Sequence, residues 1–261
     1  MKQLKSTCED LRNLFERDIT VRHVFEELKT FDFNEKACKV QKEMEELDFD
    51  VSGVRRDGIV YGYVERTGLG SGQCEDYVRK FPPSEIIAQS APLTELLVYL
   101  RDSPRVFVKD QENIVGIVTR GDLQKAPMRM YYFGLMSLTE MQLLRIVRST
   151  CPNESWKKLL SSSRLKKAND FLLQRKIRNE ALDLADCLQI CDKLKIVCNI
   201  SEVQGYIRNS IGKAEKLTKS IESLRNKLAH AQDLVTGSTW TEVINLAGEM
   251  QRLLEFLEKI Y

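Results

Sequence analysis

The sequence predicts an α+β protein with two domains, a mixed domain followed by an all-helical one. The chain has 261 residues, 43% hydrophobic and 30% charged, a globular composition in a length that suits two modest domains. Short β-branched runs alternate with amphipathic stretches up to about residue 130, and from Ser137 onward apolar residues recur at helical spacing. We expect domains over 15–130 and 137–261, joined by a short connection.

The first domain is expected to begin with a helical segment and a β-hairpin. The amphipathic stretch around residues 24–49 favours helix, and two apolar strands follow within 51–65. The tripeptide Arg-Asp-Gly at 56–58 separates these strands, and Asp-Gly is a favoured turn between paired strands. A Gly-rich connection over 68–73 ends this part of the domain.

A similar order recurs in the rest of the first domain. Residues 82–103 favour an extended entry and a helix, 105–110 a strand, and 114–119 a second strand that runs into another helix. Two units of about 55 residues indicate an internal duplication.

The second half of the chain is expected to form an antiparallel helix bundle. Ser137 and Glu140 have the spacing of a capping box, and Pro152 is expected to break the helix that they begin. Three long helical stretches are expected to follow, around 163–198, 201–234 and 239–260.

Charge, cysteines and hydropathy limit the class of protein. Residues 1–136 carry 20 basic and 23 acidic side chains and 137–261 carry 20 and 15, so only the second half favours an anionic partner. Seven scattered cysteines do not suit a disulfide framework. No segment reaches the ~18 apolar residues of a membrane span, and the first residues lack the apolar run of a signal peptide. We expect a cytoplasmic protein without membrane contact.

The segment 114–123 carries a ligand-binding pattern. An apolar strand ends in Thr119, and Asp122 follows at the start of a helix. A hydroxyl and helix-start amides suit phosphate oxygens, and a carboxylate suits the vicinal hydroxyls of ribose. The segment resembles the cystathionine β-synthase type of regulatory module, the CBS domain, whose repeats occur in pairs with a β-α-β-β-α order. The resemblance covers residues 15–130.

The CBS resemblance implies that the first domain senses an adenine nucleotide: AMP, ADP, ATP or S-adenosylmethionine. It implies that Thr119 meets phosphate, that Asp122 holds the ribose, and that Arg120 is a second phosphate contact. The first repeat has Glu65 in place of Thr119 and Gly68 in place of Asp122, so one nucleotide site per pair is expected. The alternative is that Thr119 and Asp122 only cap a helix, since both residue types are favoured there.

Arg225, Asn226 and His230 carry the main pattern of the second half. Five residues along a helix advance about 140° beyond a full turn, so Arg225 and His230 do not share one face of a straight helix, whereas Asn226 and His230 do. A bent helix end or a partner chain must bring Arg225 and His230 together. In this motif a polar residue follows the Arg directly, and a His comes after four intervening residues. The motif resembles that of the ribonuclease members of the HEPN family (higher eukaryotes and prokaryotes nucleotide-binding). That family has an all-helical fold, and the resemblance covers 137–261.

The HEPN resemblance implies a metal-independent endoribonuclease that acts on RNA as a homodimer, with no cofactor required for catalysis and a toxin-like or phage-defence role. His230 would exchange protons with the ribose 2′-hydroxyl and the leaving 5′-oxygen, and Arg225 would hold the phosphate. Asn226 would orient the histidine or hydrogen bond to the phosphate. Two alternatives stay open. Arg225 and His230 are ordinary cations near a helix C-terminus, or the protein is a non-catalytic, nucleotide-sensing dimer that binds RNA or protein.

Other candidate residues are expected to be structural. His23 has no evident partner, and the cysteines at 187, 191 and 198 have no fourth ligand beside them, so we expect core packing and no metal site. The densest basic cluster is expected to be a solvated helix face, with RNA contact as the alternative. It consists of Lys157, Lys158, Arg164, Lys166 and Lys167.

Overall fold

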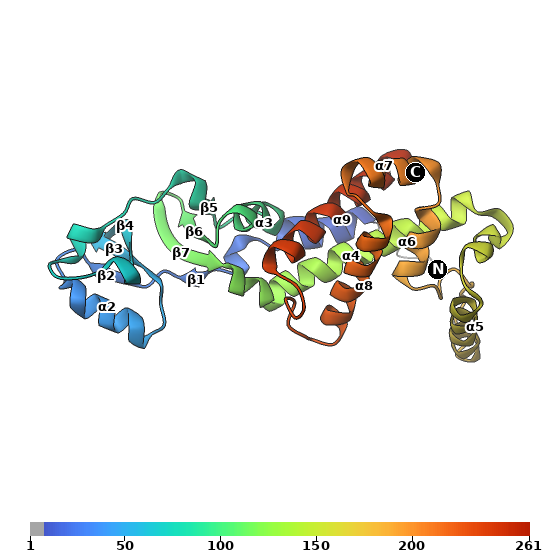
Figure 1. Ribbon diagram of the computed structural model, residues 1–261, viewed down its shortest axis with the longest axis horizontal. Coiled ribbons are helices and arrows are strands. Elements are labelled where there is room, and N and C mark those ends of the chain that lie inside the picture. Colours follow the sequence, from blue (N-terminus) through green and yellow to red (C-terminus); the bar gives the residue numbers. More distant parts are fainter. Residues whose placement is uncertain (1–7) are drawn as a thin grey trace. The chain divides into compact units, whose positions relative to one another are not determined.

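The computed structural model describes residues 8–261 and divides them into two compact units (Figure 1). One, which we call the repeat unit, comprises residues 16–128, and the other, the helical unit, comprises 8–15 together with 129–261. Every strand of the described chain lies in the repeat unit, so a mixed part followed by a helical part is confirmed. None of the helices within residues 8–261 combines the length and the apolar character that a bilayer crossing requires.

The first repeat is a three-stranded sheet covered by one helix. β2 (Thr30–Asp32) is parallel to β3 (Val51–Arg56), and α2 (Ala37–Glu46) connects these two strands. β3 is antiparallel to β4 (Ile59–Glu65). The turn between them, residues 57–58, has positive φ angles of 51° and 81°, as the turn predicted from Asp-Gly requires.

The second repeat has the same order and the same pairing. β5 (Ile86–Ala88) is parallel to β6 (Arg105–Asp110), and α3 (Leu93–Asp102) connects them. β6 is antiparallel to β7 (Asn113–Thr119). The internal duplication expected from the sequence is therefore present in the structure.

The last helix of each repeat is shorter than the sequence predicts. Both repeats end in a 3-10 helix, Arg66–Gly68 in the first and Arg120–Gln124 in the second. A separate helix, α4 (Ala126–Thr150), begins after the second of these. Pro127 lies in the first turn of α4, where the missing N–H of proline is tolerated, and so favours a new helix start over continuation of the old one.

The helix expected over 24–49 is wrong for its first half, residues 24–36. β1 (Glu26–Glu27) pairs antiparallel with β7, and β2 follows, so α2 is the helix in this region. Gly116, opposite Glu27 in β7, allows this pairing: a Cβ there would lie 2.2 Å from Cδ2 of Phe25 and 2.7 Å from the Glu26 carbonyl oxygen. Pairing with a distant strand thus overrides a local helical pattern.

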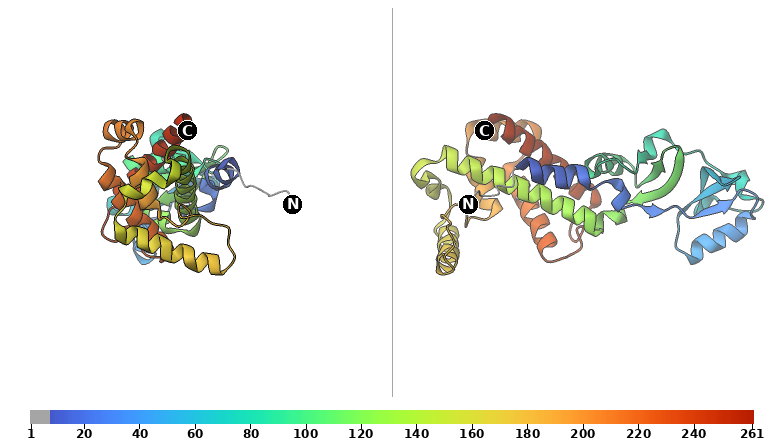
Figure 2. Two further views of the ribbon diagram at one scale, coloured as in Figure 1. Left: turned by 90° about the vertical axis from the view of Figure 1, so that its right-hand side faces the viewer. Right: turned by 180° about the vertical axis from the view of Figure 1, so that it is seen from behind.

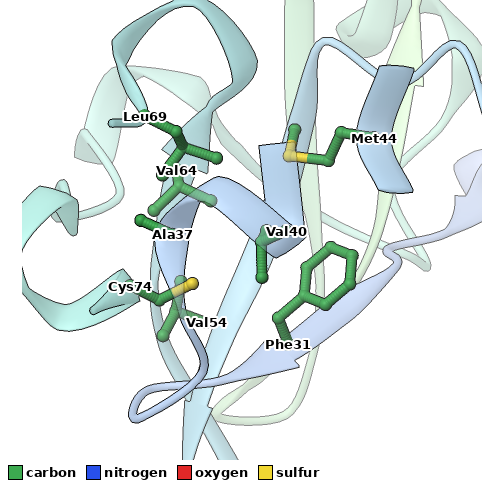
Figure 3. Close-up of a cluster of buried hydrophobic side chains, with 8 residues drawn as sticks. All are labelled: Phe31, Ala37, Val40, Met44, Val54, Val64, Leu69 and Cys74. Atoms are coloured by element: carbon green, nitrogen blue, oxygen red, sulfur yellow. The ribbon is translucent and has the colours of Figure 1, made fainter. Parts of the chain in front are cut away.

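Two apolar clusters hold the repeat unit together. α2 packs on the first sheet through a cluster of buried side chains (Figure 3), which are Phe31, Ala37, Val40, Met44, Val54, Val64, Leu69 and Cys74. A second cluster joins the repeats, because Tyr63 of β4 lies with its ring centroid 4.9 Å from that of Phe107 in β6. The two repeats therefore share a core.

Helices make up the helical unit (Figures 1 and 2). Arg12, at the end of the first of them, donates from Nη2 to Glu258 Oε2 of the last at 2.8 Å. Phe15 packs on α4, where a Cβ at Gly134 would lie 2.2 Å from the phenyl ring. Besides α4, the helices are α1 (Cys8–Arg12), α5 (Ser162–Ile177), α6 (Ile190–Val197), α7 (Ser201–Ser210), α8 (Ala214–Ala229) and α9 (Trp240–Ile260).

The capping box predicted at Ser137 and Glu140 is wrong. Both residues lie inside α4, and the boundary between the units, at 128–129, also falls within this helix. Ser137 Oγ donates to the Phe133 carbonyl at 2.9 Å, and Thr139 Oγ1 donates to the Leu135 carbonyl at 2.8 Å. These bonds to carbonyls four residues back let the hydroxyls sit in a helix interior.

Two of the three long helices expected after residue 160 are interrupted, whereas the third, expected over 239–260, is confirmed as α9. α5 ends before Asn179, which has a φ of 58°, and α7 ends before Gly212, which has a φ of 118°. Asn and Gly accept this left-handed conformation better than other residues, and a helix cannot continue through it. The break at Pro152 is confirmed, since α4 ends at Thr150 and a 3-10 helix, Pro152–Leu159, follows.

Candidate functional site

A cavity of about 740 Å³ lies in the repeat unit, where residues of both repeats meet. The second repeat contributes Thr119 at the end of β7 and Asp122 in the following 3-10 helix. The first repeat contributes the segment 25–29 around β1, together with Phe49 and Val51 at the start of β3. The structure thus brings the predicted ligand residues Thr119 and Asp122 together in one cavity.

Asp122 is held in place by its own neighbours. Its Oδ2 accepts hydrogen bonds from the Thr119 amide at 2.7 Å and from Thr119 Oγ1 at 3.0 Å. Its Oδ1 lies 2.8 Å from Lys125 Nζ, which also contacts the Glu26 carboxylate and donates to the Val24 carbonyl at 2.6 Å. The helix cap made by Thr119 and Asp122, which the sequence analysis gives as the alternative to ligand binding, is therefore formed. The Asp122 carboxylate that makes this cap also lines the cavity.

Lys125 fixes this arrangement electrostatically. Burial by itself lowers the pKa of Lys125, but the hydrogen bonds and charges of Asp122 and Glu26 outweigh burial and raise it. The ammonium group therefore stays charged and holds the 3-10 helix against β1.

The lining of the cavity is partly acidic and partly apolar. Glu26, Glu27 and Asp122 supply carboxylates, and the ammonium group of Lys29 already lies 2.9 Å from the Glu43 carboxylate. The apolar part includes the ring of Phe49, which is 40% exposed. The cavity therefore offers an accessible planar ring and acceptors for hydroxyl groups, in a field that disfavours a strongly anionic ligand.

Arg120 does not reach this cavity. Its Nε donates to the Leu100 carbonyl at 2.8 Å, and its Nη2 donates to the Arg101 carbonyl at 3.0 Å. These carbonyls belong to the last turn of α3, where a cation is favourable. The guanidinium group caps α3, so it is not placed for the phosphate contact expected from the sequence.

The equivalent position of the first repeat is occupied by an ion-pair network. Glu65, at the end of β4, lies 2.5 Å from Arg105 Nη2 and 2.6 Å from Arg79 Nη1. Burial lowers the pKa of Arg105, and the interaction with Glu65 outweighs burial and raises it. Gly68 stands where the second repeat has Asp122. The Glu65 carboxylate is thus neutralised within the protein, in agreement with the expected loss of a ligand site in this repeat.

Solved structures similar to the N-terminal part of this chain are CBS-domain proteins. A conserved CBS domain protein of unknown function from Thermoplasma acidophilum is 20% identical, with a TM-score of 0.35, and the match covers 44% of this chain and 75% of that one. CBSX2 in complex with AMP is 17% identical, with a TM-score of 0.38, over 42% of this chain and 97% of that one. No protein-family model matches the chain, and no curated protein matches it.

Among the cavity residues not expected from the sequence are four with aromatic or carboxylate side chains: Phe25, Glu26, Glu27 and Phe49. All four lie in the stretch 24–49, which the sequence pattern predicts to be helical and to which it gives no ligand role. Gly116 is a signal for the segment 25–27, because a glycine within a strand often marks close approach of another backbone, and no such signal marks Phe49.

The structure places Arg225 and Asn226 together and His230 elsewhere. Arg225 Nη1 donates to Asn226 Oδ1 at 2.9 Å, and Arg225 lines a second cavity, of about 460 Å³. α8 ends at Ala229, and His230 follows as its exposed C-cap, with its amide donating to the Asn226 carbonyl at 3.0 Å. His230 is not among the residues that line the second cavity. Among residues 8–261, Arg225 makes a hydrogen bond to Asn226 and none to His230.

The remaining candidates have structural roles. His23 Nδ1 accepts from the Thr20 amide at 3.1 Å, a local contact that caps a short 3-10 helix. Cys187, Cys191 and Cys198 are buried, and burial raises the pKa of the Cys198 thiol to about 12. Among residues 8–261 we find no group of three or more His, Cys, Asp or Glu side chains that could hold a metal ion.

Proposed function

We propose that the repeat unit is a regulatory module that binds an adenine nucleoside or nucleotide in the cavity at Thr119 and Asp122. The observation that carries this proposal is the cavity itself, which joins the two residues expected to contact nucleotide with an aromatic and apolar wall from the first repeat. A drug-sized or nucleotide-sized ligand needs a pocket of roughly 300–1,000 Å³, and the volume of about 740 Å³ falls in this range.

Each part of the ligand has a partner in the cavity. Oδ2 of Asp122 accepts two hydrogen bonds from Thr119 and Oδ1 one from Lys125, so the carboxylate has one acceptor position left, on Oδ1, for a ribose hydroxyl. Thr119 is exposed and lines the cavity, and its hydroxyl donates to a phosphate oxygen once it rotates away from the Asp122 carboxylate to which it donates in the free protein. The ring of Phe49 and the side chains of Phe25 and Val51 suit the planar base. Arg120 has no part in this site.

The proposal includes one site per pair of repeats. In the first repeat, Arg79 and Arg105 already neutralise Glu65, and Gly68 supplies no carboxylate. Opening that position to a ligand requires breaking two ion pairs, one of them to the largely buried Arg105.

Calorimetry and thermal unfolding test this function. Adenosine, AMP, ADP, ATP and S-adenosylmethionine are titrated separately, with AMP first because CBSX2 was solved with it. A ligand that binds the native state alone stabilises it by about 2.7 kcal/mol at a hundred times its Kd, which is visible as a raised melting temperature. We expect at least one ligand to raise the melting temperature and Asp122→Ala to abolish the rise. If none of the five ligands binds, this function is wrong.

A second candidate function, RNA cleavage by the helical unit, stays a prediction. The observation that favours it is the bond from Arg225 to Asn226, since it joins the phosphate-binding and orienting residues that the mechanism needs. Because His230 lies apart from Arg225 within one chain, cleavage requires a homodimer in which a second copy supplies the missing group. Incubation of the protein with mixed RNA and EDTA, beside His230→Ala, tests it. If no RNA is cut, this second function is wrong.

A further inference from the structure

A third cavity, of about 340 Å³, lies in the helical unit between α8 and α9, which pack side by side (Figure 1). The α8 residues that line it recur every three or four positions, so they share one face of the helix. They are Lys216, Lys219, Ser220, Ser223, Leu224 and Lys227. The opposite side comes from α9 and the loop before it. Arg225, Asn226 and His230 are not among the lining residues, so this cavity is distinct from the site predicted for RNA cleavage.

Lys227 is the buried cation of this cavity, with only 8% of the residue exposed. Its Nζ atom donates to the Leu234 carbonyl at 2.9 Å and to Ser238 Oγ at 2.8 Å. Both acceptors are neutral, and an ammonium group has three N–H donors, so one donor remains beyond these two bonds. No ion pair of Lys227 occurs among residues 8–261. Because a buried charge is unfavourable without a counter-charge, an anion bound here would stabilise the lysine.

The two carboxylates that line the cavity do not neutralise Lys227. Glu242 Oε2 accepts from the Thr239 amide at 2.8 Å and so caps α9. Burial raises the pKa of Glu249 against the opposing charges of nearby cations, which disfavours the charged form of this side chain. The negative charge that Lys227 lacks therefore has to come from a ligand.

Apolar side chains limit the kind of anion that fits. Four buried apolar residues line the cavity, namely Leu224, Leu234, Val243 and Leu246. An apolar wall beside one buried cation suits a ligand that carries a single negative charge on an apolar body. Glu242 and Glu249 disfavour a second negative charge, such as that of a phosphate dianion. The volume of about 340 Å³ is near the lower end of the roughly 300–1,000 Å³ typical of ligand pockets, so it suits a small molecule.

From these observations we infer that the third cavity binds a small monocarboxylic acid with an apolar body. The carboxylate accepts from the remaining N–H of Lys227, and the hydroxyl of Ser223, one turn earlier on the same face of α8, donates to its second oxygen. The aliphatic or aromatic body packs on Leu224, Val243 and Leu246. This site depends neither on the nucleotide cavity of the repeat unit nor on cleavage of RNA.

Calorimetric titration of the full chain tests the inference with hexanoate, benzoate, hexanamide and succinate as probes. Hexanoate and benzoate are expected to bind, since each has one carboxylate on an apolar body. Hexanamide has nearly the shape of hexanoate without its charge, so it is expected to bind about 10-fold to 100-fold more weakly, through the loss of a charge-assisted hydrogen bond. Succinate is expected to bind more weakly than hexanoate, because Glu242 and Glu249 repel its second carboxylate.

Lys227→Met removes the charge and keeps a long apolar side chain. It is expected to abolish the preference for hexanoate over hexanamide, a ratio that a displaced loop by itself would not change. Lys193→Met is the matched control, since Lys193 is a buried lysine of α6 outside this cavity, with its Nζ 2.7 Å from the Glu140 carboxylate. The control is expected to bind hexanoate like the parent protein.

Ser223→Phe provides a second test that leaves Lys227 in place. Ser223 is exposed and lines the cavity, so a phenyl ring there is expected to fill the space and exclude hexanoate without disturbing the core. This variant decides the question even if Lys227→Met fails to fold. Asp122→Ala and His230→Ala are expected to leave hexanoate binding unchanged.

Three outcomes would overturn the inference. One is that neither hexanoate nor benzoate binds. Another is that hexanamide binds as tightly as hexanoate, which would show that the charge of Lys227 is not the partner of the carboxylate. The third is that Ser223→Phe binds hexanoate like the parent protein, which would show that the acid binds outside this cavity.

Discussion

Asp122 accepts hydrogen bonds from both the amide and the hydroxyl of Thr119, at 2.7 and 3.0 Å, and the same carboxylate lines the cavity proposed for a nucleotide. One side chain therefore shapes the end of β7 and presents an acceptor to the ligand. The two roles are separable, since an asparagine keeps the acceptor for the Thr119 amide but loses the negative charge.

The first prediction uses this separation. Asp122→Asn is expected to keep the fold and to lose about tenfold or more in nucleotide affinity, because hydrogen bonds to a charged acceptor contribute about 1.5–3 kcal/mol. Calorimetric titration with AMP measures the affinity, and thermal unfolding without ligand measures stability. Asp76→Asn is the control, since Asp76 caps Gln73 in the same way, at 2.9 Å, outside the cavity. Equal AMP affinity in both variants would contradict the role of Asp122.

The second prediction concerns the charge of the ligand. Because Glu26, Glu27 and Asp122 line the cavity, adenosine, AMP and S-adenosylmethionine are expected to bind more tightly than ATP in EDTA. Glu27→Gln is expected to raise the ATP affinity about twofold to tenfold, an effect that added salt reduces. Glu112→Gln, in the turn between β6 and β7, is the matched control. Calorimetry checks the order, and tighter binding of metal-free ATP than of AMP would contradict it.

The third prediction tests the position of Arg120. Arg120→Ala removes two hydrogen bonds to the last turn of α3, so the free energy of unfolding is expected to fall by about 1–3 kcal/mol. The affinity for AMP is expected to stay unchanged. Urea denaturation and calorimetry of the same variant measure the two quantities. A large loss of AMP affinity with unchanged stability would show that Arg120 contacts the phosphate, as expected from the sequence.

The fourth prediction concerns the ion-pair network of the first repeat. Glu65→Ala leaves Arg105, which is 21% exposed, with only the longer ion pair from its Nε to Glu85 at 3.9 Å, and is expected to cost about 2–4 kcal/mol of stability. Arg79→Ala breaks the other ion pair of Glu65 at a side chain that is 55% exposed, so the expected cost is below about 1 kcal/mol. Urea denaturation compares the two variants. Equal costs would show that burial of Arg105 does not decide the stability of this network.

The fifth prediction concerns RNA cleavage. If the helical unit cuts RNA, the products are expected to end in a 2′,3′-cyclic phosphate and a 5′-hydroxyl, since the 2′-hydroxyl of the substrate is the nucleophile. His230→Ala is then expected to lower the rate about 100-fold to 10,000-fold, with Arg225→Ala close behind and Asn226→Ala less affected. End analysis of the cleaved RNA and gel assays with EDTA check this. DNA lacks the attacking hydroxyl, so it should stay intact, and cleavage that survives His230→Ala would refute the site.

Local chemistry explains what could be predicted of the fold. The turn at 57–58 follows from Asp-Gly, the helix break at Pro152 follows from proline, and the position of Thr119 at a strand end follows from the apolar run before it. In each case the residues that decide the structure are neighbours in the chain. The duplicated order of strands and helices was predictable for the same reason.

The errors have a common physical origin in contacts between distant segments. Glu26 and Glu27 lie in a strand because β7 pairs with them, and Gly116 leaves the room for this pairing. Arg120 points to α3 because the carbonyls of that helix end accept its hydrogen bonds. Neither partner is visible in the local pattern.

The sequence by itself singled out the candidate ligand-binding and catalytic residues: Thr119 and Asp122 in the repeats, and Arg225, Asn226 and His230 in the helical half. Only the tertiary structure decided which of them share a site. It placed Thr119 and Asp122 in one cavity with β1, and it turned Arg225 toward α5 while leaving His230 exposed beyond the end of α8. The reason is that residue type and spacing encode local conformation, whereas a binding site is built from surfaces that meet only when distant segments pack.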